Sequence, residues 1–216
     1  MKHPDPRLRA YCDLVVAEPT SVTAVRDPAR AWEVLVEDAL AAVPIVRALA
    51  PAEAVDVGSG GGTPGIPLAI ALDLDVTLLE ATGTKCRFLE RAAATVEAPC
   101  TVVHARSEEY ARGEGRDRFA LAFARALAPP PVAAELVLPL VAPGGAAILW
   151  TGAVVDSAAI AETAALVGGE VEAVHRGADR RRLVVLRKLG PTPERFPRRP
   201  GIARARPLVP VPSVSA

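Results

Sequence analysis

Histidine and cysteine are scarce in this chain of 216 residues, which contains three of each. Cys12, Cys86 and Cys100 lie far apart, with no C-x-x-C pair and too little histidine nearby for a zinc site. The histidines are equally scattered, so no acid–base pair stands out. We therefore expect free thiols and no bound metal.

Long uninterrupted apolar runs are also absent, because Glu135, Pro139 and Pro143 break the longest candidate. The beginning of the chain, residues 1–7, is too polar and proline-rich for a signal peptide. Half of the residues are apolar, enough to bury the core of one domain with extra segments. These features predict a cytoplasmic protein with no membrane partner, and we expect a monomer.

Lysine is rare, with three lysines against 22 arginines, and the net charge is zero. The charge is uneven, however, since residues 176–206 hold eleven basic and only two acidic residues. An acidic body with a basic end is typical of a protein that contacts phosphate locally. Because arginine is frequent throughout, a merely solvated basic arm fits the composition equally well.

Strand and helix patterns alternate along the chain, which is typical of a doubly wound α/β sheet with right-handed crossovers. Helices are expected over residues 28–50, 67–72, 85–96, 132–140 and 157–167, and strands ending at Val57 and over 76–80, 101–104, 119–124, 146–150, 170–175 and 182–187. The last two strands leave no room for a crossover helix, so they should form an antiparallel hairpin. A parallel sheet closed by such a hairpin resembles the Rossmann-like class I methyltransferase fold, with seven strands.

Three regions follow from this pattern. Residues 1–50 form a helical N-terminal cap, residues 51–189 form the α/β domain, and residues 190–216 form a basic tail. The tail is rich in proline, so we expect it to run extended without regular structure.

The sequence V-D-V-G-S-G-G-G-T-P-G-I-P at residues 55–67 places a glycine loop between a strand and a helix. Gly58 and Gly60 would let the backbone approach a cofactor closely. Glu80 ends the next strand, where a carboxylate can accept both ribose hydroxyls of an adenosine. The loop alone is a weak signal, but its coincidence with Glu80 predicts an adenosine-containing cofactor.

The same loop favours S-adenosylmethionine over a dinucleotide. The G-x-G-x-x-G pattern of pyrophosphate cofactors would require glycine where this chain has Thr63, and Pro64 follows. Asp56 would repel a pyrophosphate but suits the ammonium group of S-adenosylmethionine.

The chain resembles the RsmG (GidB) family of 16S ribosomal RNA guanine-N7 methyltransferases. The resemblance rests on D-V-G-S-G-G-G-T-P-G-I-P from residue 56, R-S-E-E from 106, A-R-A from 124, and R-F-P-R-R-P-G from 195. It implies methyl transfer to N7 of one guanine in small-subunit ribosomal RNA, as naked RNA or in the subunit. The cap departs from the family at Leu35, where histidine is common.

The resemblance also implies roles for single residues. Gly58 and Thr63 would contact the cofactor, Ser107 and Glu108 would hold the adenine, and Arg125 would lie at the edge of the cofactor near the transfer site. Arg125 is thus the one catalytic candidate, suited to a carboxylate or phosphate contact. The expected RNA-binding arginines of the tail are Arg198, Arg199, Arg204 and Arg206.

Guanine N7 carries a lone pair and no proton, so its methylation needs no general base and depends mainly on positioning. This suits a sequence without an acid–base pair. Two alternatives stay open from the sequence. One is a methyltransferase for another acceptor, such as a small molecule. The other is a non-catalytic RNA- or ribosome-binding relative, which the departure at Leu35 allows.

Overall fold

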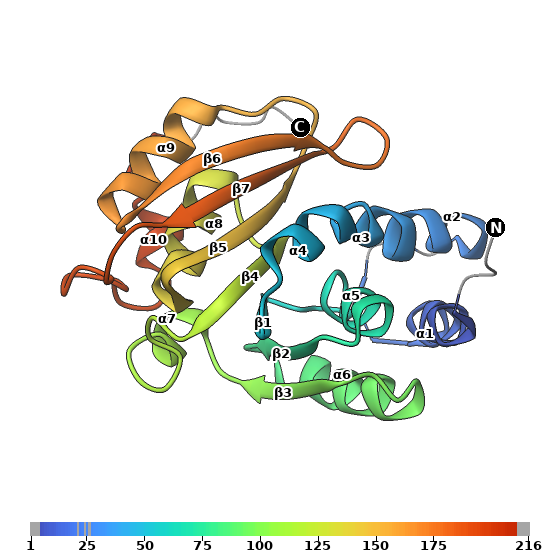
Figure 1. The fold of residues 1–216 in the computed structure, drawn as a ribbon. Helices are drawn as coiled ribbons and strands as arrows, with labels where there is room; N and C mark the ends of the chain where they lie inside the picture. Colours follow the sequence, from blue (N-terminus) through green and yellow to red (C-terminus); the bar gives the residue numbers. More distant parts are fainter. Residues whose placement is uncertain (1–4, 21, 24, 26, 211–216) are drawn as a thin grey trace. The chain divides into compact units, whose positions relative to one another are not determined.

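The computed structural model describes residues 5–20, 22, 23, 25 and 27–210. The outer ends of the predicted cap and tail, residues 1–4 and 211–216, lie outside this part of the chain. The chain forms two compact units, residues 1–105 and 106–216. Within the described residues, seven strands form one sheet in the order β3-β2-β1-β4-β5-β7-β6, which confirms the predicted fold class (Figure 1). The division at residues 50 and 189 remains a prediction.

The first unit holds three parallel strands and the helices that pack against them. Its strands are β1 (Glu53–Val57), β2 (Asp75–Glu80) and β3 (Cys100–His104). Helix α5 (Gly65–Leu72) follows β1, and α6 (Gly83–Thr95) follows β2. Parallel strands covered by crossover helices need apolar residues on both faces, and Ala54, Val55 and Val57 are accordingly buried.

The N-terminal cap is helical, but the predicted single helix over residues 28–50 is wrong. The structure contains α2 (Pro28–Trp32), a π-helical turn η1 (Glu33–Glu37), α3 (Asp38–Leu40) and α4 (Val43–Leu49). Pro44 cannot donate a backbone hydrogen bond, so the helix stops and restarts with this proline in its first turn. A further helix, α1 (Pro6–Ala17), was not predicted, and Asp5 caps it by accepting a hydrogen bond from Arg7 N.

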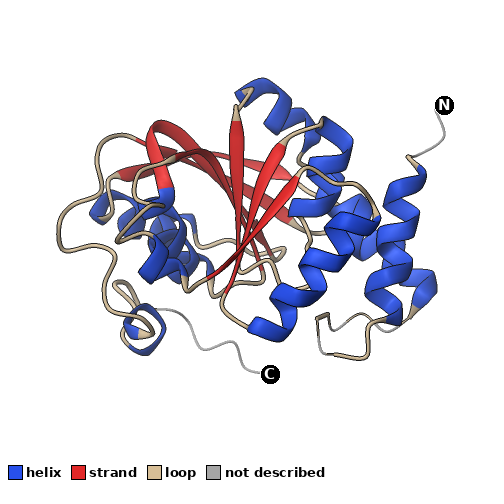
Figure 2. Cartoon of the chain, turned by 90° about the horizontal axis from the view of Figure 1, so that it is seen from below, coloured by secondary structure: helices blue, strands red, loops and turns tan. Residues whose placement is uncertain are grey.

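The second unit holds β4 (Phe119–Arg125), β5 (Val141–Thr151), β6 (Gly169–Arg176) and β7 (Arg182–Lys188). β4 and β5 are parallel, whereas β7 pairs antiparallel with both β5 and β6. The predicted terminal hairpin is therefore confirmed, and Figure 1 shows β6 and β7 side by side in orange. Its helices are α7 (Ser107–Tyr110), α8 (Pro130–Val137), the 3-10 turn η2 (Leu138–Leu140), α9 (Ser157–Leu166) and α10 (Ile202–Ala205). Figure 2 marks the helices in blue and the strands in red.

The expectation that the tail has no regular structure is wrong at one place. Helix α10 forms between Pro200 and Pro207, in the longest proline-free stretch of the described part of the tail, where consecutive residues can donate backbone hydrogen bonds. Gly201 precedes it with a φ of 82°, a conformation that glycine adopts without strain. Ala203 of α10 packs against Val132 and Leu136 of α8, so the tail shares a small apolar cluster with the second unit.

Candidate functional site

The glycine loop leaves β1 through backbone conformations that need glycine. Gly58, Gly60 and Gly62 have φ angles of 71°, 55° and 93°, where a Cβ atom causes strain. The loop is seated on the end of β2, because Gly58 N donates to Leu79 O at 2.7 Å. Three left-handed residues within five positions thus present backbone rather than side chains, as the sequence pattern predicts.

Glu80 fixes a carboxylate beside this loop. Its side chain is only 6% exposed, Oε2 accepts from Gly60 N at 3.0 Å, and Oε1 accepts from Thr82 N at 2.8 Å. The Cys86 thiol donates to the Glu80 carbonyl at 3.3 Å and holds the backbone of the same residue. A carboxylate oxygen can accept more than one hydrogen bond, so both oxygens keep capacity for the hydroxyls of a ribose.

Asp56 lies under the loop and holds the start of α5. It is 1% exposed, and its Oδ2 accepts from Gly65 N at 3.0 Å. A Cβ at Gly65 would lie 2.6 Å from Leu78 Cδ2 and 2.7 Å from Asp56 Oδ2, so only glycine permits this approach of helix to strand. Gly65 was not among the predicted site residues. The predicted contact of Asp56 with the ammonium group of the cofactor stays a prediction.

The N-terminal cap covers one side of the loop. Thr63 Oγ1 donates to the carbonyl of Leu35 at 2.8 Å, within the π-helical turn, where Leu35 is fully buried. Tyr11 of α1 donates its buried hydroxyl to Gly61 O at 2.9 Å. The hydroxyl of Thr63, predicted to touch the cofactor, is thus engaged by the cap. No local sequence signal pointed to Tyr11, which lies fifty positions before its partner.

These features fit an adenosine-containing cofactor such as S-adenosylmethionine. The loop offers exposed backbone shaped by glycine, and Glu80 offers an immobilised acceptor for ribose hydroxyls. Among the described residues, no group of three or more histidine, cysteine, aspartate or glutamate side chains could hold a metal ion. In the same part of the chain, no helix combines the length and apolarity needed to cross a membrane.

The three cysteines are free, as predicted. Burial raises the pKa of all three thiols, and it raises that of Cys100 to about 12. A thiol with a raised pKa is a poor nucleophile at neutral pH.

In the second unit, the two residues predicted to hold the adenine lie in the short helix α7. Ser107 Oγ donates to Glu108 Oε2 at 3.2 Å, and both residues are buried. Glu108 Oε1 also accepts from Gly201 N at 2.9 Å, so its carboxylate is linked to the C-terminal tail. Arg125 ends β4 opposite Trp150 of β5, at the carboxyl ends of parallel strands, where α/β proteins bind ligands.

Side chains hold the tail against the rest of the second unit. We call residues 190–206 the C-terminal strap. Arg116 donates to the carbonyls of Thr192 and Phe196 at 2.7 and 2.8 Å, and Arg112 donates to that of Pro197 at 3.2 Å. Farther along, the Arg198 guanidinium forms a two-pronged ion pair with Glu135, with both distances 2.6 Å. Glu135 is only 2% exposed, so this pair is largely shielded from water.

A buried polar cluster anchors the beginning of the strap. Lys188 is fully buried, and its ammonium contacts Asp117 at 3.1 Å and Leu138 O at 2.9 Å. Burial lowers the pKa of Lys188, and the hydrogen bond to Asp117 opposes this only in part. Burial would raise the pKa of Asp117, but hydrogen bonds from Thr192 and Lys188 outweigh it and lower the pKa. Both side chains therefore tie β7 and the strap to the segment before β4.

The four arginines predicted to bind RNA fall into two groups. Arg198 pairs with Glu135, and Arg204 donates to the carbonyl of Leu127, so both hold the strap in place. Arg199 and Arg206 are exposed. Pattern reasoning overlooked Glu135 and Arg116, since the contacts of these residues span more than sixty positions.

Comparisons with known proteins give matches over most of the chain. The model of the GidB family, described as rRNA small subunit methyltransferase G, matches residues 6–184. The ribosomal RNA small subunit methyltransferase G of Chloroflexus aggregans is 42% identical over 168 residues, which cover 74% of this chain and 71% of that protein. The protein of the same name from Symbiobacterium thermophilum is 36% identical over 209 residues, with 88% and 84% covered.

Solved structures share the fold at low identity. A putative O-methyltransferase from Klebsiella pneumoniae superposes with a TM-score of 0.57 at 15% identity, covering 88% of this chain and 92% of that one. A mutant form of MtNAS in complex with S-adenosylmethionine gives a TM-score of 0.57 at 15% identity, covering 85% and 72%. These matches show the methyltransferase fold.

Proposed function

Because this chain belongs to the GidB family, the rRNA small subunit methyltransferases G, we propose that it methylates N7 of one guanine in 16S ribosomal RNA. Family membership confirms the predicted class of enzyme, its use of S-adenosylmethionine and its small-subunit ribosomal RNA substrate. The choice of N7, the roles of single residues, the monomeric state and the cytoplasmic location are parts of the proposal. The family match over residues 6–184 is the observation that carries it.

The methyl transfer requires mainly that the protein position the cofactor and the guanine. S-adenosylmethionine, when bound, supplies an activated methyl group on its sulfonium. The glycine loop from Gly58 would hold the cofactor by its backbone, and Glu80 would accept hydrogen bonds from the ribose hydroxyls. Asp56 would support the ammonium end, either directly or by fixing Gly65 and the start of α5. Thr63 would contribute indirectly, by fixing the loop to the cap.

In the second unit, we assign Ser107 and Glu108 to the adenine and Arg125 to the edge of the transfer site. The guanine becomes positively charged during transfer, so a nearby guanidinium is better suited to a carboxylate or phosphate than to the reacting base. Arg199 and Arg206, being exposed, are the proposed RNA contacts among the four tail arginines, while Arg198 and Arg204 hold the strap.

The test is to incubate the protein with unmodified small-subunit RNA, or with subunits, and S-adenosylmethionine carrying a labelled methyl group. The expected product is one labelled 7-methylguanosine after digestion to nucleosides, identified by mass. Cells that lack the protein should lose one 7-methylguanosine from 16S ribosomal RNA. A label on another nucleoside, or on another kind of molecule, would overturn the N7 assignment. Cofactor binding without transfer to RNA would favour the non-catalytic alternative.

A further inference from the structure

The C-terminal strap contacts the segments that precede and follow β4. Near its beginning, Thr192 N donates to Asp117, just before β4 starts. Its other end reaches Leu127, just beyond the carboxyl end of β4, through Arg204. The strap therefore leads toward the edge of the sheet where ligands bind in α/β folds.

Between these anchor points the strap borders a basic groove. The groove has a volume of about 710 Å³ and is lined by five arginines, one glutamate and three uncharged residues (Arg112, Arg116, Glu194, Arg195, Phe196, Pro197, Arg198, Arg199 and Ile202). Arg198 is paired with Glu135, but the other four arginines against Glu194 leave an excess of positive charge in the lining, so its partner should be an anion.

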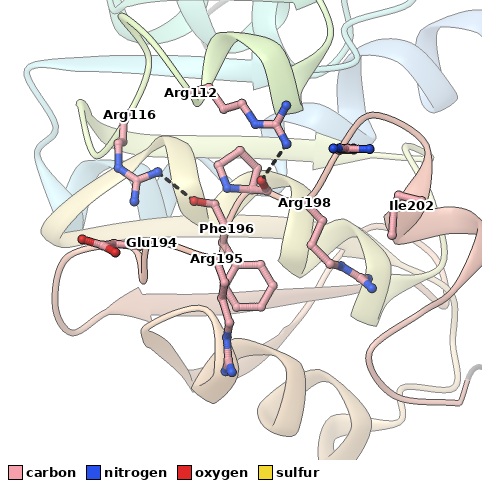
Figure 3. A pocket seen from close by; sticks show the side chains of 9 residues that line it. Arg112, Arg116, Glu194, Arg195, Phe196, Arg198 and Ile202 are labelled. Carbon is pink, nitrogen blue, oxygen red and sulfur yellow. Dashed lines mark hydrogen bonds between the residues drawn. The ribbon is translucent and has the colours of Figure 1, made fainter.

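The arginines of the groove do two different things. Figure 3 shows Arg112 and Arg116 directed at the backbone around Phe196, to which their dashed hydrogen bonds run. With these hydrogen bonds, Arg112 and Arg116 hold the backbone that forms one wall of the groove. Arg195 and Arg199 are exposed, and among the described residues no acceptor or carboxylate holds either guanidinium. Arg195 is steadied instead by the ring of Phe196, whose centroid lies 5.2 Å from its guanidinium carbon.

An arginine-rich composition does not account for this arrangement. Arg116 bridges two carbonyls with two separate nitrogens of its planar guanidinium. The ring of Phe196 is 2% exposed, so it fixes the strap and is not available to stack on a base. The groove thus offers charge without a base-reading surface, which is the pattern of phosphate recognition.

We propose that this groove binds phosphates of the ribosomal RNA backbone, with Arg195 and Arg199 as the contacts. Arg112 and Arg116 are positioning residues that hold the wall. This inference rests on the proposed RNA substrate, and it extends the RNA surface from the end of the tail to the α7–β4 side of the second unit. The contacts are to phosphate, so they add affinity and orientation and leave the choice of guanine to other residues.

The experiment measures RNA binding by an Arg195→Gln/Arg199→Gln variant of the full chain at several salt concentrations, with 16S ribosomal RNA as the probe. Loss of two phosphate contacts should reduce the slope of log affinity against log salt by about 1.5. Affinity at low salt should fall on the order of tenfold. Affinity for S-adenosylmethionine, measured by calorimetry, should not change.

The matched control is Arg47→Gln/Arg87→Gln, which removes the same charge from two exposed arginines of the first unit. It should leave the salt slope unchanged, and an equal loss in both variants would overturn the proposal in favour of a net-charge effect. Arg195→Lys/Arg199→Lys should keep the slope and weaken binding by about threefold, since charge is kept and the fork is lost. If the salt slope is unchanged in the glutamine variant while the wild type methylates RNA, phosphate binding by the groove is refuted and the proposed function stands. A wild type that binds RNA through the groove and forms no 7-methylguanosine would instead overturn the proposed function.

Discussion

The glycine loop and the C-terminal strap are held in opposite ways. The loop is stabilised by its own backbone and by two buried carboxylates, Asp56 and Glu80, which accept from backbone N–H groups nine and twenty residues away. The strap is held by arginine side chains that donate to backbone carbonyls and to Glu135, across more than sixty positions. In the loop, acidic side chains support main-chain donors, whereas in the strap basic side chains support main-chain acceptors.

Because of this difference, we expect the glycine loop and the C-terminal strap to serve separate functions. Carboxylates turned inward leave the loop backbone free to face a cofactor, whereas arginines along the strap leave spare positive charge at the surface. Damage to the loop should therefore change cofactor affinity with little effect on RNA, and damage to the strap should do the reverse.

The largest expected effect tests the loop. Gly58→Val places a β-branched side chain at a φ of 71°, in the proposed path of the cofactor. We expect affinity for S-adenosylmethionine to fall by about 1,000-fold or more, measured by calorimetry. The matched control is Gly152→Val, because a Cβ at Gly152 meets nothing within 4 Å. Near-normal cofactor affinity in a folded Gly58→Val protein would refute the loop as the cofactor site.

The next effect tests the strap. Arg198→Met leaves the 2% exposed carboxylate of Glu135 without its partner. We expect the free energy of unfolding to fall by about 3 kcal/mol, measured by urea denaturation. Binding of RNA should weaken because the strap loosens, and affinity for S-adenosylmethionine should fall far less than in Gly58→Val.

The double variant Arg198→Met/Glu135→Met is the control for this prediction. It replaces the pair by apolar side chains and should recover most of the lost stability. If the single and double variants are equally unstable, the buried charge is not the cause.

The smallest expected effect lies where the cap meets the loop. Tyr11→Phe removes the buried hydrogen bond to Gly61 O, which should lower the free energy of unfolding by about 1 kcal/mol. Cofactor affinity should fall by about threefold, because one support of the loop is lost. Tyr110→Phe serves as the comparison, since the Tyr110 hydroxyl accepts from the exposed Arg118 within the second unit. Equal losses in the two variants would show that the cap does not specifically support the loop.

The sequence predicts the loop better than the strap for a physical reason. The glycines of the loop, Asp56 and Glu80 lie close together in the chain. The residue types alone therefore indicate the backbone conformation of the loop. The strap depends on partners such as Glu135 and Arg116, which resemble any other charged residue until the fold brings them together. The role of Arg198 could not be predicted for the same reason.

The cap shows an intermediate case. Helical spacing over residues 28–50 correctly indicated helices, yet it could not show the π-helical turn in which the Leu35 carbonyl receives Thr63. The sequence indicates no partner for the Thr63 hydroxyl, but in the structure this hydroxyl donates a hydrogen bond to the cap. Motif residues carried over from a family thus indicate where a site lies, but the partners of their side chains can be identified only in the folded structure.

The burial of Lys188 has a practical consequence for probe chemistry. The chain has only three lysines, and this one is fully enclosed, while Lys85 lies on α6 and Lys2 belongs to the residues before α1. Amine-reactive dyes do not acylate guanidinium groups at neutral pH, since arginine stays protonated. A fluorophore attached through amines will therefore be confined to the first 85 residues, and every arginine of the groove will remain unmodified for titration with RNA.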